Sequence, residues 1–212
     1  MEQQILNVNP LVAVFDGFVT GEEAAAAIAA GRDRLGPSGY LIGDERRTGA
    51  TRSNLNAIID VWSDPVLSGL GLRLSALVRL PPENMDRAKL LHYQGDEKFD
   101  PHQDAYDPAS AIGQEKLRSG GQRLFTTICY LNDADGGHTQ FPELKISVQP
   151  RMGRVLLFSN TVPGTIAQHP HALHAGRPTR SGEKWVLSLW WRQFPFVEVR
   201  TYPATDGPMR EF

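Results

Sequence analysis

Cysteine is almost absent from this chain of 212 residues. With Cys129 alone the chain cannot form an internal disulfide, and nothing points to an oxidising compartment. Basic residues are not in excess either: the formal net charge is -2, which disfavours nucleic acid as a partner. No apolar run approaches the roughly 18 residues that a membrane span needs, and the first ten residues lack the features of a signal peptide. We therefore expect a cytoplasmic protein with no nucleic-acid or membrane partner.

The bulk composition is that of an ordinary globular protein. Hydrophobic residues make up 41% of the chain and charged residues 22%, and 212 residues suit one domain. Two helices are predicted in the N-terminal part. The first covers residues 20–36, where Thr20 and Glu23 have the form of a capping box and a run of alanines favours helix. The second covers residues 64–80, with Asp64 at the N-cap and leucines at helical spacing.

After the second helix the pattern changes to short apolar runs separated by turn residues. These runs predict about eight strands, which indicates a sandwich or barrel. The predicted strands are residues 89–94, 99–106, 123–131, 138–144, 145–150, 154–160, 171–177 and 184–194. Residues 107–122 are polar and rich in Gly and Ser, so we expect a loop there that could cover a substrate.

The segment FDPHQDAY carries His102 and Asp104 two positions apart. In a strand such residues point to the same side, so both could face one cavity. Two histidines and one carboxylate on one face of a metal are the signature of non-haem iron(II) oxygenases. A third ligand would have to come from a later strand, and the segment PHALHAGRP offers His169, His171 and His174.

Lys184 follows the last of these histidines, His174, after an AGRP turn. We expect the two residues on neighbouring antiparallel strands that aim both side chains into one interior. An iron site of this kind leaves positions open for a bidentate keto-acid and for oxygen. A lysine nearby could neutralise the far carboxylate of that keto-acid as a point charge.

Five short motifs occur together between residues 89 and 194: HxD, YLND, GGxT, LHAG and GEKW. In this order and spacing the segment resembles the catalytic domain of the prolyl 4-hydroxylase family of iron(II)- and 2-oxoglutarate-dependent dioxygenases. The upstream TRSN, with Arg52 and Ser53, also matches an arginine-serine pair of that family. One departure is His138, which precedes Thr139 where the family usually has an acidic residue.

The resemblance implies a mainly β protein with N-terminal support helices, folded as a double-stranded β-helix, or jelly roll. Within one compact domain we expect a helical and strand support region at residues 1–88. The dioxygenase core would cover residues 89–196, and residues 197–212 would form a C-terminal tail. A loop or flap is expected at residues 44–52.

The resemblance also assigns site residues. It implies that His102, Asp104 and His174 are the iron(II) ligands and that Lys184 binds the distal carboxylate of 2-oxoglutarate. Tyr93 and Thr139 are implied as further hydrogen-bond partners of that cosubstrate. Arg123 and Trp190 are implied to lie near the substrate. Ascorbate is the implied reductant. His92 and His138 are expected to be structural or cavity-lining, and Cys129 a buried small hydrophobe.

The function that the resemblance implies is hydroxylation of an unactivated C–H bond with release of succinate and carbon dioxide. The favoured substrate is a peptidyl proline in a peptide or protein. The alternatives are hydroxylation of a free amino acid or another small molecule, and a non-catalytic jelly roll that only binds peptide. Nucleic-acid demethylation is disfavoured, because the related fold usually anchors the keto-acid with arginines and this chain has Lys184 and a slightly negative charge.

Overall fold

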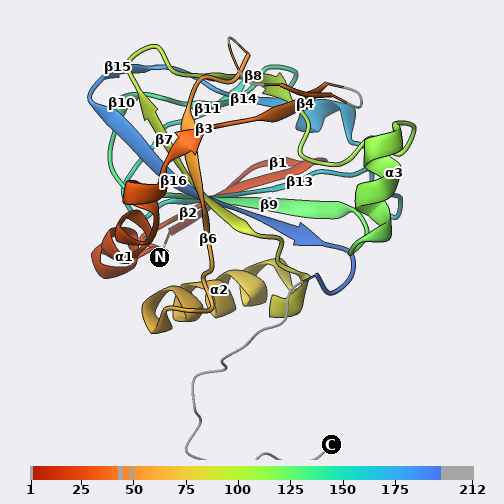
Figure 1. Ribbon diagram of the computed structural model, residues 1–212, viewed down its shortest axis with the longest axis horizontal. Helices are drawn as coiled ribbons and strands as arrows, with labels where there is room; N and C mark the ends of the chain where they lie inside the picture. Colours follow the sequence, from red (N-terminus) through yellow and green to blue (C-terminus); the bar gives the residue numbers. More distant parts are fainter. Residues whose placement is uncertain (1, 43–44, 48, 50, 197–212) are drawn as a thin grey trace, which may run out of the picture.

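The computed structural model describes residues 2–42, 45–47, 49 and 51–196 (Figure 1). The predicted tail at residues 197–212 and part of the predicted flap at residues 44–52 lie outside these described residues. None of the helices in the described part of the chain combines the length and the apolar character that crossing a membrane requires.

Two antiparallel sheets face each other and form a jelly roll, as expected (Figure 1). The large sheet has the strand order β1 (Glu2–Val8), β2 (Leu11–Asp16), β13 (Val155–Ser159), β9 (Arg123–Tyr130), β16 (Glu183–Arg192), β7 (Ala88–Gln94), β6 (Leu55–Ile59) and β3 (Gly36–Pro37). The small sheet has the order β12 (Ile146–Val148), β11 (Thr139–Phe141), β14 (His174–Gly176) and β8 (Phe99–His102). Two short pairs complete the strands, β4 (Tyr40–Ile42) with β5 (Glu45–Arg47) and β10 (Asp135–Gly136) with β15 (Thr179–Ser181).

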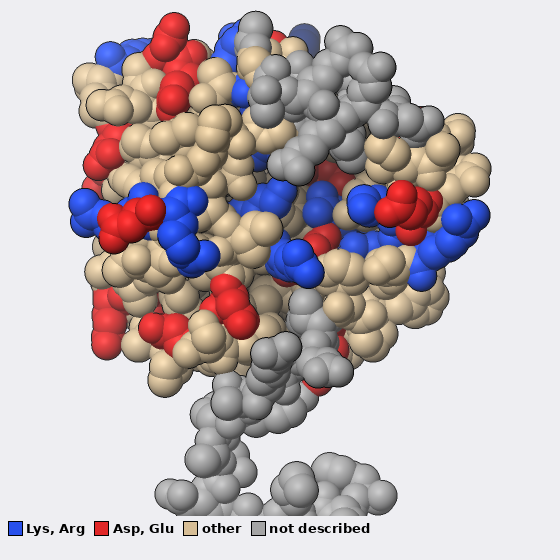
Figure 2. All heavy atoms as spheres, viewed as in Figure 1, with Lys and Arg blue, Asp and Glu red and all other residues tan. Residues whose placement is uncertain are grey.

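Each of the eight predicted strand segments overlaps a strand of the structure. A cavity of about 960 Å³ lies between the sheets, lined by residues of both. The space-filling view, seen from the same side as Figure 1, shows a hollow in the surface with Lys and Arg side chains in it (Figure 2). The jelly roll therefore leaves an open interior at one end, where a site can be built.

Strand β16 shows how alternating side chains build both faces of the large sheet. Leu187, Leu189 and Trp191 are buried in the cluster on the outer face. Val186 belongs to the cluster between the sheets, and Trp190 lines the cavity. Trp190 and Trp191 therefore face opposite sides of the sheet, one toward the cavity and one in the core. Each fully buried leucine contributes about 1.5–3 kcal/mol of hydrophobic stabilisation.

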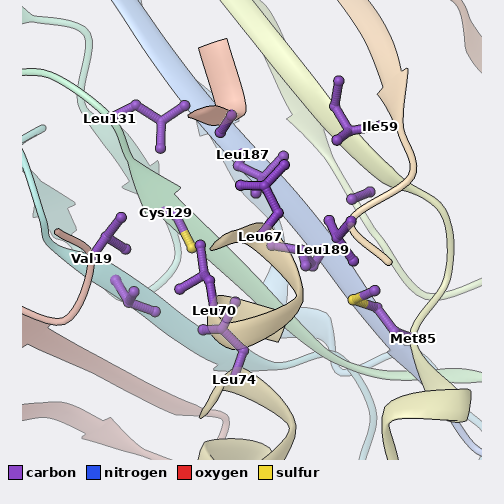
Figure 3. Packing of buried hydrophobic residues seen from close by; sticks show 14 of the residues in the cluster. Val19, Ile59, Leu67, Leu70, Leu74, Met85, Cys129, Leu131, Leu187 and Leu189 are labelled. Atoms are coloured by element: carbon purple, nitrogen blue, oxygen red, sulfur yellow. The ribbon is translucent and has the colours of Figure 1, made fainter. Parts of the chain in front are cut away.

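The predicted support helices cover the outer face of the large sheet (Figure 1). In α2 (Pro65–Val78), leucines at helical spacing face the leucines of β16 (Figure 3). Cys129 lies in the same cluster and is fully buried, as expected. Asp64 caps α2 by accepting hydrogen bonds from the amides of Val66, at 2.8 Å, and Leu67, at 3.0 Å.

The helix predicted at residues 20–36 is shorter than expected. Its capping box is present, with Thr20 accepting from the amide of Glu23 at 3.2 Å, but α1 (Gly21–Gly31) ends five residues early. One 3₁₀ turn (Arg32–Arg34) follows, because the chain from Gly36 onward pairs with β6 instead. Gly31 lies so close to the sheet that an added Cβ would be 2.6 Å from Cδ1 of Ile59.

Candidate active site

His102 and His174 lie opposite each other in the small sheet. His102 ends β8, His174 begins β14, and the two are direct register partners with ring centroids 4.3 Å apart. Asp104 follows two residues after β8 ends, so the predicted strand at residues 99–106 is shorter than expected. The Nε2 atoms of His102 and His174 are 3.7 Å and 3.5 Å from the Asp104 carboxylate oxygens. The ligand atoms of the three residues all lie within 4.8 Å of one another, which suits one metal ion.

Backbone carbonyls set the orientation of both rings. Nδ1 of His102 is 2.9 Å from the carbonyl oxygen of Asp100, and Nδ1 of His174 is 3.0 Å from that of Ala172. With Nδ1–H donating to these carbonyls, each Nε2 keeps its lone pair for a metal. Burial, and then the neighbouring His174, lower the pKa of His102 to about 3, so this ring is in the neutral form that coordinates metals.

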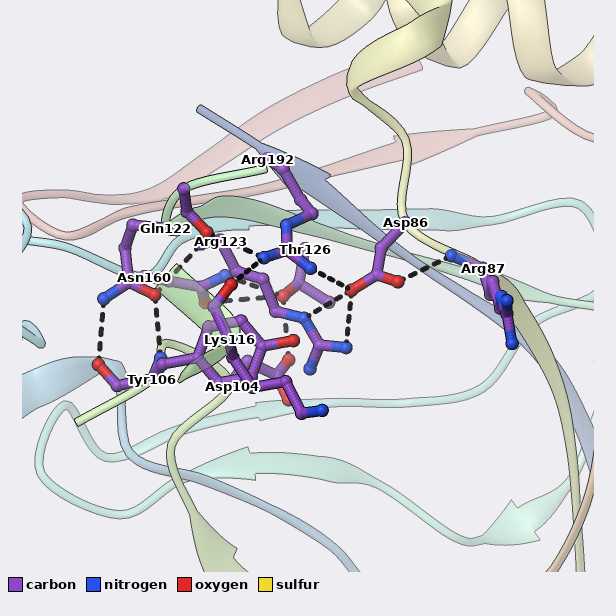
Figure 4. Close-up of polar contacts among 11 residues, drawn as sticks. Asp86, Arg87, Asp104, Tyr106, Lys116, Gln122, Arg123, Thr126, Asn160 and Arg192 are labelled. Carbon is purple, nitrogen blue, oxygen red and sulfur yellow. Dashed lines mark hydrogen bonds and ion pairs between the residues drawn. The ribbon is translucent and has the colours of Figure 1, made fainter. Parts of the chain in front are cut away.

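Asp104 is held by Thr126 of β9 and, through Thr126, by Asn160, which follows β13. The Thr126 hydroxyl donates to its carboxylate at 2.7 Å, and Asn160 donates to the Thr126 hydroxyl at 2.9 Å (Figure 4). Burial alone would raise the pKa of Asp104, but the nearby histidines and Arg123 outweigh it and lower the pKa to about 2. The carboxylate is therefore ionised and oriented, as a metal ligand must be.

Lys184 lies on the inner face of the large sheet and is only 2% exposed. Its ammonium donates to the carbonyl of Gly137 at 2.9 Å and lies 3.8 Å from the ring centroid of Tyr93. It has no carboxylate partner in the part of the chain that the structure describes, and burial lowers its pKa to about 7. A desolvated cation of this kind fits the anionic end of a bound molecule.

The structure corrects one geometric expectation about Lys184. It lies in β16 of the large sheet, whereas His174 lies in β14 of the small sheet, so the two are not on neighbouring strands. They reach one interior because the sheets face each other, and both line the cavity. The register partner of Lys184 in the large sheet is Tyr93.

Tyr93 and Thr139 both line the cavity near Lys184. The hydroxyl of Thr139 accepts a hydrogen bond from the Tyr130 hydroxyl at 2.7 Å, which leaves its own proton free for another acceptor. Burial raises the pKa of Tyr93 to about 12, so its hydroxyl stays a donor. Gly176 permits this packing, since an added Cβ would lie 3.2 Å from the Tyr93 hydroxyl.

Arg123 and Trp190 line another part of the cavity. The guanidinium of Arg123 lies 4.3 Å from the ring centroid of Trp190 and 4.8 Å from that of Tyr106. It donates to Asp86 at 2.7 Å and 3.0 Å (Figure 4). Burial alone would lower the pKa of Arg123, but Asp86 more than offsets this and raises it. Asp86 was not predicted from the sequence, because a lone acidic residue before a strand carries no distinctive pattern.

The remaining histidines stay outside the metal cluster. His169 caps a 3₁₀ turn (Pro170–Ala172), with its Nδ1 accepting from the amide of His171 at 3.2 Å. His92 lies 2.8 Å from a carboxylate oxygen of Glu183. Neither these histidines nor His138 line the cavity, so the expectation that His92 is structural agrees with its contacts.

The loop expected at residues 107–122 contains a helix, α3 (Ala111–Arg118). Ser110 caps it by accepting from the amide of Gly113 at 2.9 Å. A Cβ at Gly113 would collide with the Asp107 carbonyl oxygen at 1.8 Å, so glycine permits the tight turn into the helix. The prediction of an irregular loop was therefore wrong, although the segment does border the cavity as expected.

Comparisons with known proteins place this geometry in a family. The profile of the 2OG-Fe(II) oxygenase superfamily matches residues 88–192. Probable prolyl 4-hydroxylase 4 of Arabidopsis thaliana is 30% identical over 226 residues, which cover 95% of this chain and 74% of that protein. The chain belongs to the prolyl 4-hydroxylase family of iron(II)- and 2-oxoglutarate-dependent dioxygenases. It is therefore a 2-oxoglutarate-dependent dioxygenase, and the resemblance found in the motifs is confirmed.

Other similarities agree with this placement. A relative from Acanthamoeba polyphaga mimivirus is 29% identical over 157 residues, which cover 72% of this chain and 65% of that protein. The 2OG complex of the viral collagen prolyl hydroxylase from Paramecium Bursaria Chlorella virus-1 has the same fold, with a TM-score of 0.68. Its identity is 24%, and the match covers 85% of this chain and 95% of that one. The family implies iron(II) and 2-oxoglutarate, and the His-Asp-His cluster with the buried lysine fits both.

Proposed function

We propose that the protein hydroxylates a proline residue within a peptide or protein, using oxygen and 2-oxoglutarate and releasing succinate and carbon dioxide. The single observation that carries the proposal is the cluster of His102, Asp104 and His174 at one end of the cavity that also contains Lys184. Bound iron(II) would supply the redox chemistry that activates oxygen. The protein's part is to hold that metal, orient both substrates and exclude water.

Each residue has a distinct task in this proposal. His102, Asp104 and His174 bind iron(II). Lys184 pairs with the distal carboxylate of 2-oxoglutarate, because its buried ammonium lacks an acidic partner among the described residues. Tyr93 and Thr139 donate hydrogen bonds to the same cosubstrate from the cavity wall.

The substrate side of the cavity favours a peptide. Arg123 presents a cation fixed by Asp86, and Trp190 adds an aromatic surface beside it. A cation can hold a peptide carbonyl, and an aromatic ring can pack on a proline ring. Proline hydroxylation also agrees with the name of the plant relative, probable prolyl 4-hydroxylase 4. One fold neighbour, from Trichoplax adhaerens, is a prolyl hydroxylase in complex with a hypoxia inducible factor peptide; it shares 16% identity, with a TM-score of 0.63.

The proposal keeps the predicted core at residues 89–196, which holds the metal cluster and Lys184. The support region at residues 1–88 supplies four strands of the large sheet, β1, β2, β3 and β6, and the helices on its outer face. We therefore expect the core not to fold without the support region. Ascorbate is proposed as the reductant that restores iron(II) after unproductive turnover.

Mass spectrometry of proline-containing peptides tests this function. The protein is incubated with iron(II), ascorbate, 2-oxoglutarate and a peptide panel, and we expect one added oxygen on proline. The Asp104→Ala variant, which loses a metal ligand, serves as the inactive control. Hydroxylation of free proline without activity on any peptide would favour the small-molecule alternative instead.

A further inference from the structure

The cavity has an excess of positive charge that the iron and cosubstrate do not remove. Among its described lining residues, six side chains are Lys or Arg and only three are Asp or Glu. Figure 2 shows Lys and Arg side chains in the hollow. The whole chain has the opposite sign, with a formal net charge of -2. Because iron(II) and doubly charged 2-oxoglutarate cancel, loading the site leaves this local excess unchanged.

Lys89 is a half-buried cation of this cavity. It lies on β7 with Leu91 and Tyr93, and all three line the cavity, so it takes an inward position that apolar residues normally occupy. Its ammonium lies 5.4 Å from the ring centroid of Trp190. Within the described part of the chain it makes no hydrogen bond or ion pair. Burial, and then the charges of Arg123 and Arg52, lower its pKa to about 8.

Arg52 is a second cation on this side whose hydrogen bonds, within the described residues, go to uncharged acceptors. It donates to the side-chain oxygen of Asn54 at 3.1 Å and to the carbonyl of Gly39 at 3.0 Å, and it lies 4.1 Å from the Phe99 ring centroid. Burial lowers its pKa. Two partly desolvated cations that have no carboxylate partner among the described residues would stabilise an anion that enters the cavity.

2-Oxoglutarate is not the anion that Lys89 and Arg52 would stabilise. In the antiparallel pair of β16 and β7, Lys184 lies opposite Tyr93 and Ser188 lies opposite Lys89. Lys89 is therefore four residues away from the level of Lys184. Four residues of extended strand span roughly 13 Å. A short dicarboxylate anchored at Lys184 and bound to the metal does not extend to Lys89. The second anion must therefore belong to the substrate.

We propose that Lys89, assisted by Arg52, binds a carboxylate of the substrate beside the residue that is oxidised, which makes acidic peptides the preferred substrates. This inference rests on the proposed function. The carboxylate could come from an Asp or Glu side chain near the proline or from the C-terminus of the peptide. Both sources offer the same charge and the same acceptor oxygens to Lys89.

Peptide binding separates the anion site from the reaction. Labelled peptides carry Glu or Gln at one of the positions flanking proline and have amidated C-termini; a further Gln peptide ends in a free carboxylate. Fluorescence anisotropy measures their affinity for the protein loaded with iron(II) and 2-oxoglutarate under anaerobic conditions. Wild type, Lys89→Gln, Lys89→Glu and the control Arg151→Gln are compared, since Arg151 is exposed and does not line the cavity.

We expect wild type and Arg151→Gln to bind the best Glu peptide about tenfold more tightly than its Gln partner, which equals about 1.4 kcal/mol. Lys89→Gln should lose this preference and Lys89→Glu should reverse it. Preference for the free C-terminus would assign the carboxylate to the peptide end and still support the site. Equal affinity for all three peptides (Glu, Gln, and Gln with a free C-terminus), or a preference that survives in Lys89→Gln, would overturn it.

Admitting oxygen then tests the reaction separately. If the Glu preference is present but no peptide gains oxygen, the anion site stands and the proposed hydroxylation fails. If peptides are hydroxylated but bound without regard to charge, the hydroxylation stands and the anion site fails.

Discussion

His102 and His174 are direct cross-strand partners, and their Nε2 atoms both point toward the carboxylate of Asp104. Because β8 and β14 are adjacent in one sheet, this pair is fixed by backbone hydrogen bonds as well as by side-chain packing. A metal site built on paired strands is more rigid than one built on loops.

The ligand set can be tested by comparing two nearby histidines. His174→Ala removes a metal ligand, so it should weaken iron(II) binding by roughly 100-fold or more and abolish turnover. Losing a residue that only hydrogen-bonds to a ligand would have a smaller effect. His171→Ala, a change of the same kind at an exposed residue outside the cluster, should leave iron binding intact. Anaerobic titration with iron(II) measures both. The opposite result would show that the ligand assignment is wrong.

Thr126 should control iron affinity without touching the metal. Thr126→Val keeps the shape but removes the hydrogen bond to Asp104, so iron(II) affinity should fall about 10–100-fold. Thr127 provides a matched control on the opposite face, where its hydroxyl accepts from the indole of Trp191 at 3.0 Å. Thr127→Val should leave metal affinity unchanged but lower the free energy of unfolding by about 1–3 kcal/mol. Equal iron affinities in the two variants would refute this role of Thr126.

Lys184 should improve cosubstrate binding at the expense of stability. Lys184→Met removes a buried cation with little change in volume, so 2-oxoglutarate affinity should fall by one to three orders of magnitude, or about 1.4–4 kcal/mol. Without cosubstrate, the variant should unfold with a free energy about 1 kcal/mol higher than wild type. Titration and thermal unfolding measure the two effects. An unchanged requirement for 2-oxoglutarate would place the anchor elsewhere.

The depressed pKa of Lys184 makes cosubstrate binding depend on pH. In the free site its pKa is about 7, so the amine is largely neutral at pH 8, and a bound carboxylate favours the charged form again. Binding of 2-oxoglutarate above pH 7 should therefore take up a proton and weaken as pH rises. Calorimetry at pH 8 in buffers of different ionisation enthalpy measures the uptake. Lys184→Arg should show none of it, since arginine stays charged; equal uptake in this variant would contradict the prediction.

Residues 107–122 should become more protected when a peptide binds. The helix α3 in this segment is only eight residues long, and lies beside the cavity, so little packing opposes its local opening. Hydrogen exchange of its amides should slow on addition of substrate peptide. Exchange in α2, which is buried on the far side of the large sheet, should stay the same. Unaltered exchange in both helices would exclude a substrate-covering role for α3.

The sequence by itself determined the reaction class and eight of the strands. His102, Asp104, His174 and Lys184 occur in motifs whose order and spacing are specific to one family. Alternating or apolar runs marked the strands of the core except the two-residue β10 and the three-residue β15. The caps at Thr20 and Asp64 were also predictable, because capping depends on residues only two or three positions apart.

Only the tertiary structure decided which distant residues meet. The closure of the jelly roll places β14 and β16 in opposite sheets, and Lys184 therefore faces His174 across the cavity. The same closure brings Thr126 to Asp104 and places the ammonium of Lys89 near the ring of Trp190. A single sequence shows the alternation of side chains along each strand, but the partner across a cavity depends on sheet order, register and twist. These are set by packing among many strands at once.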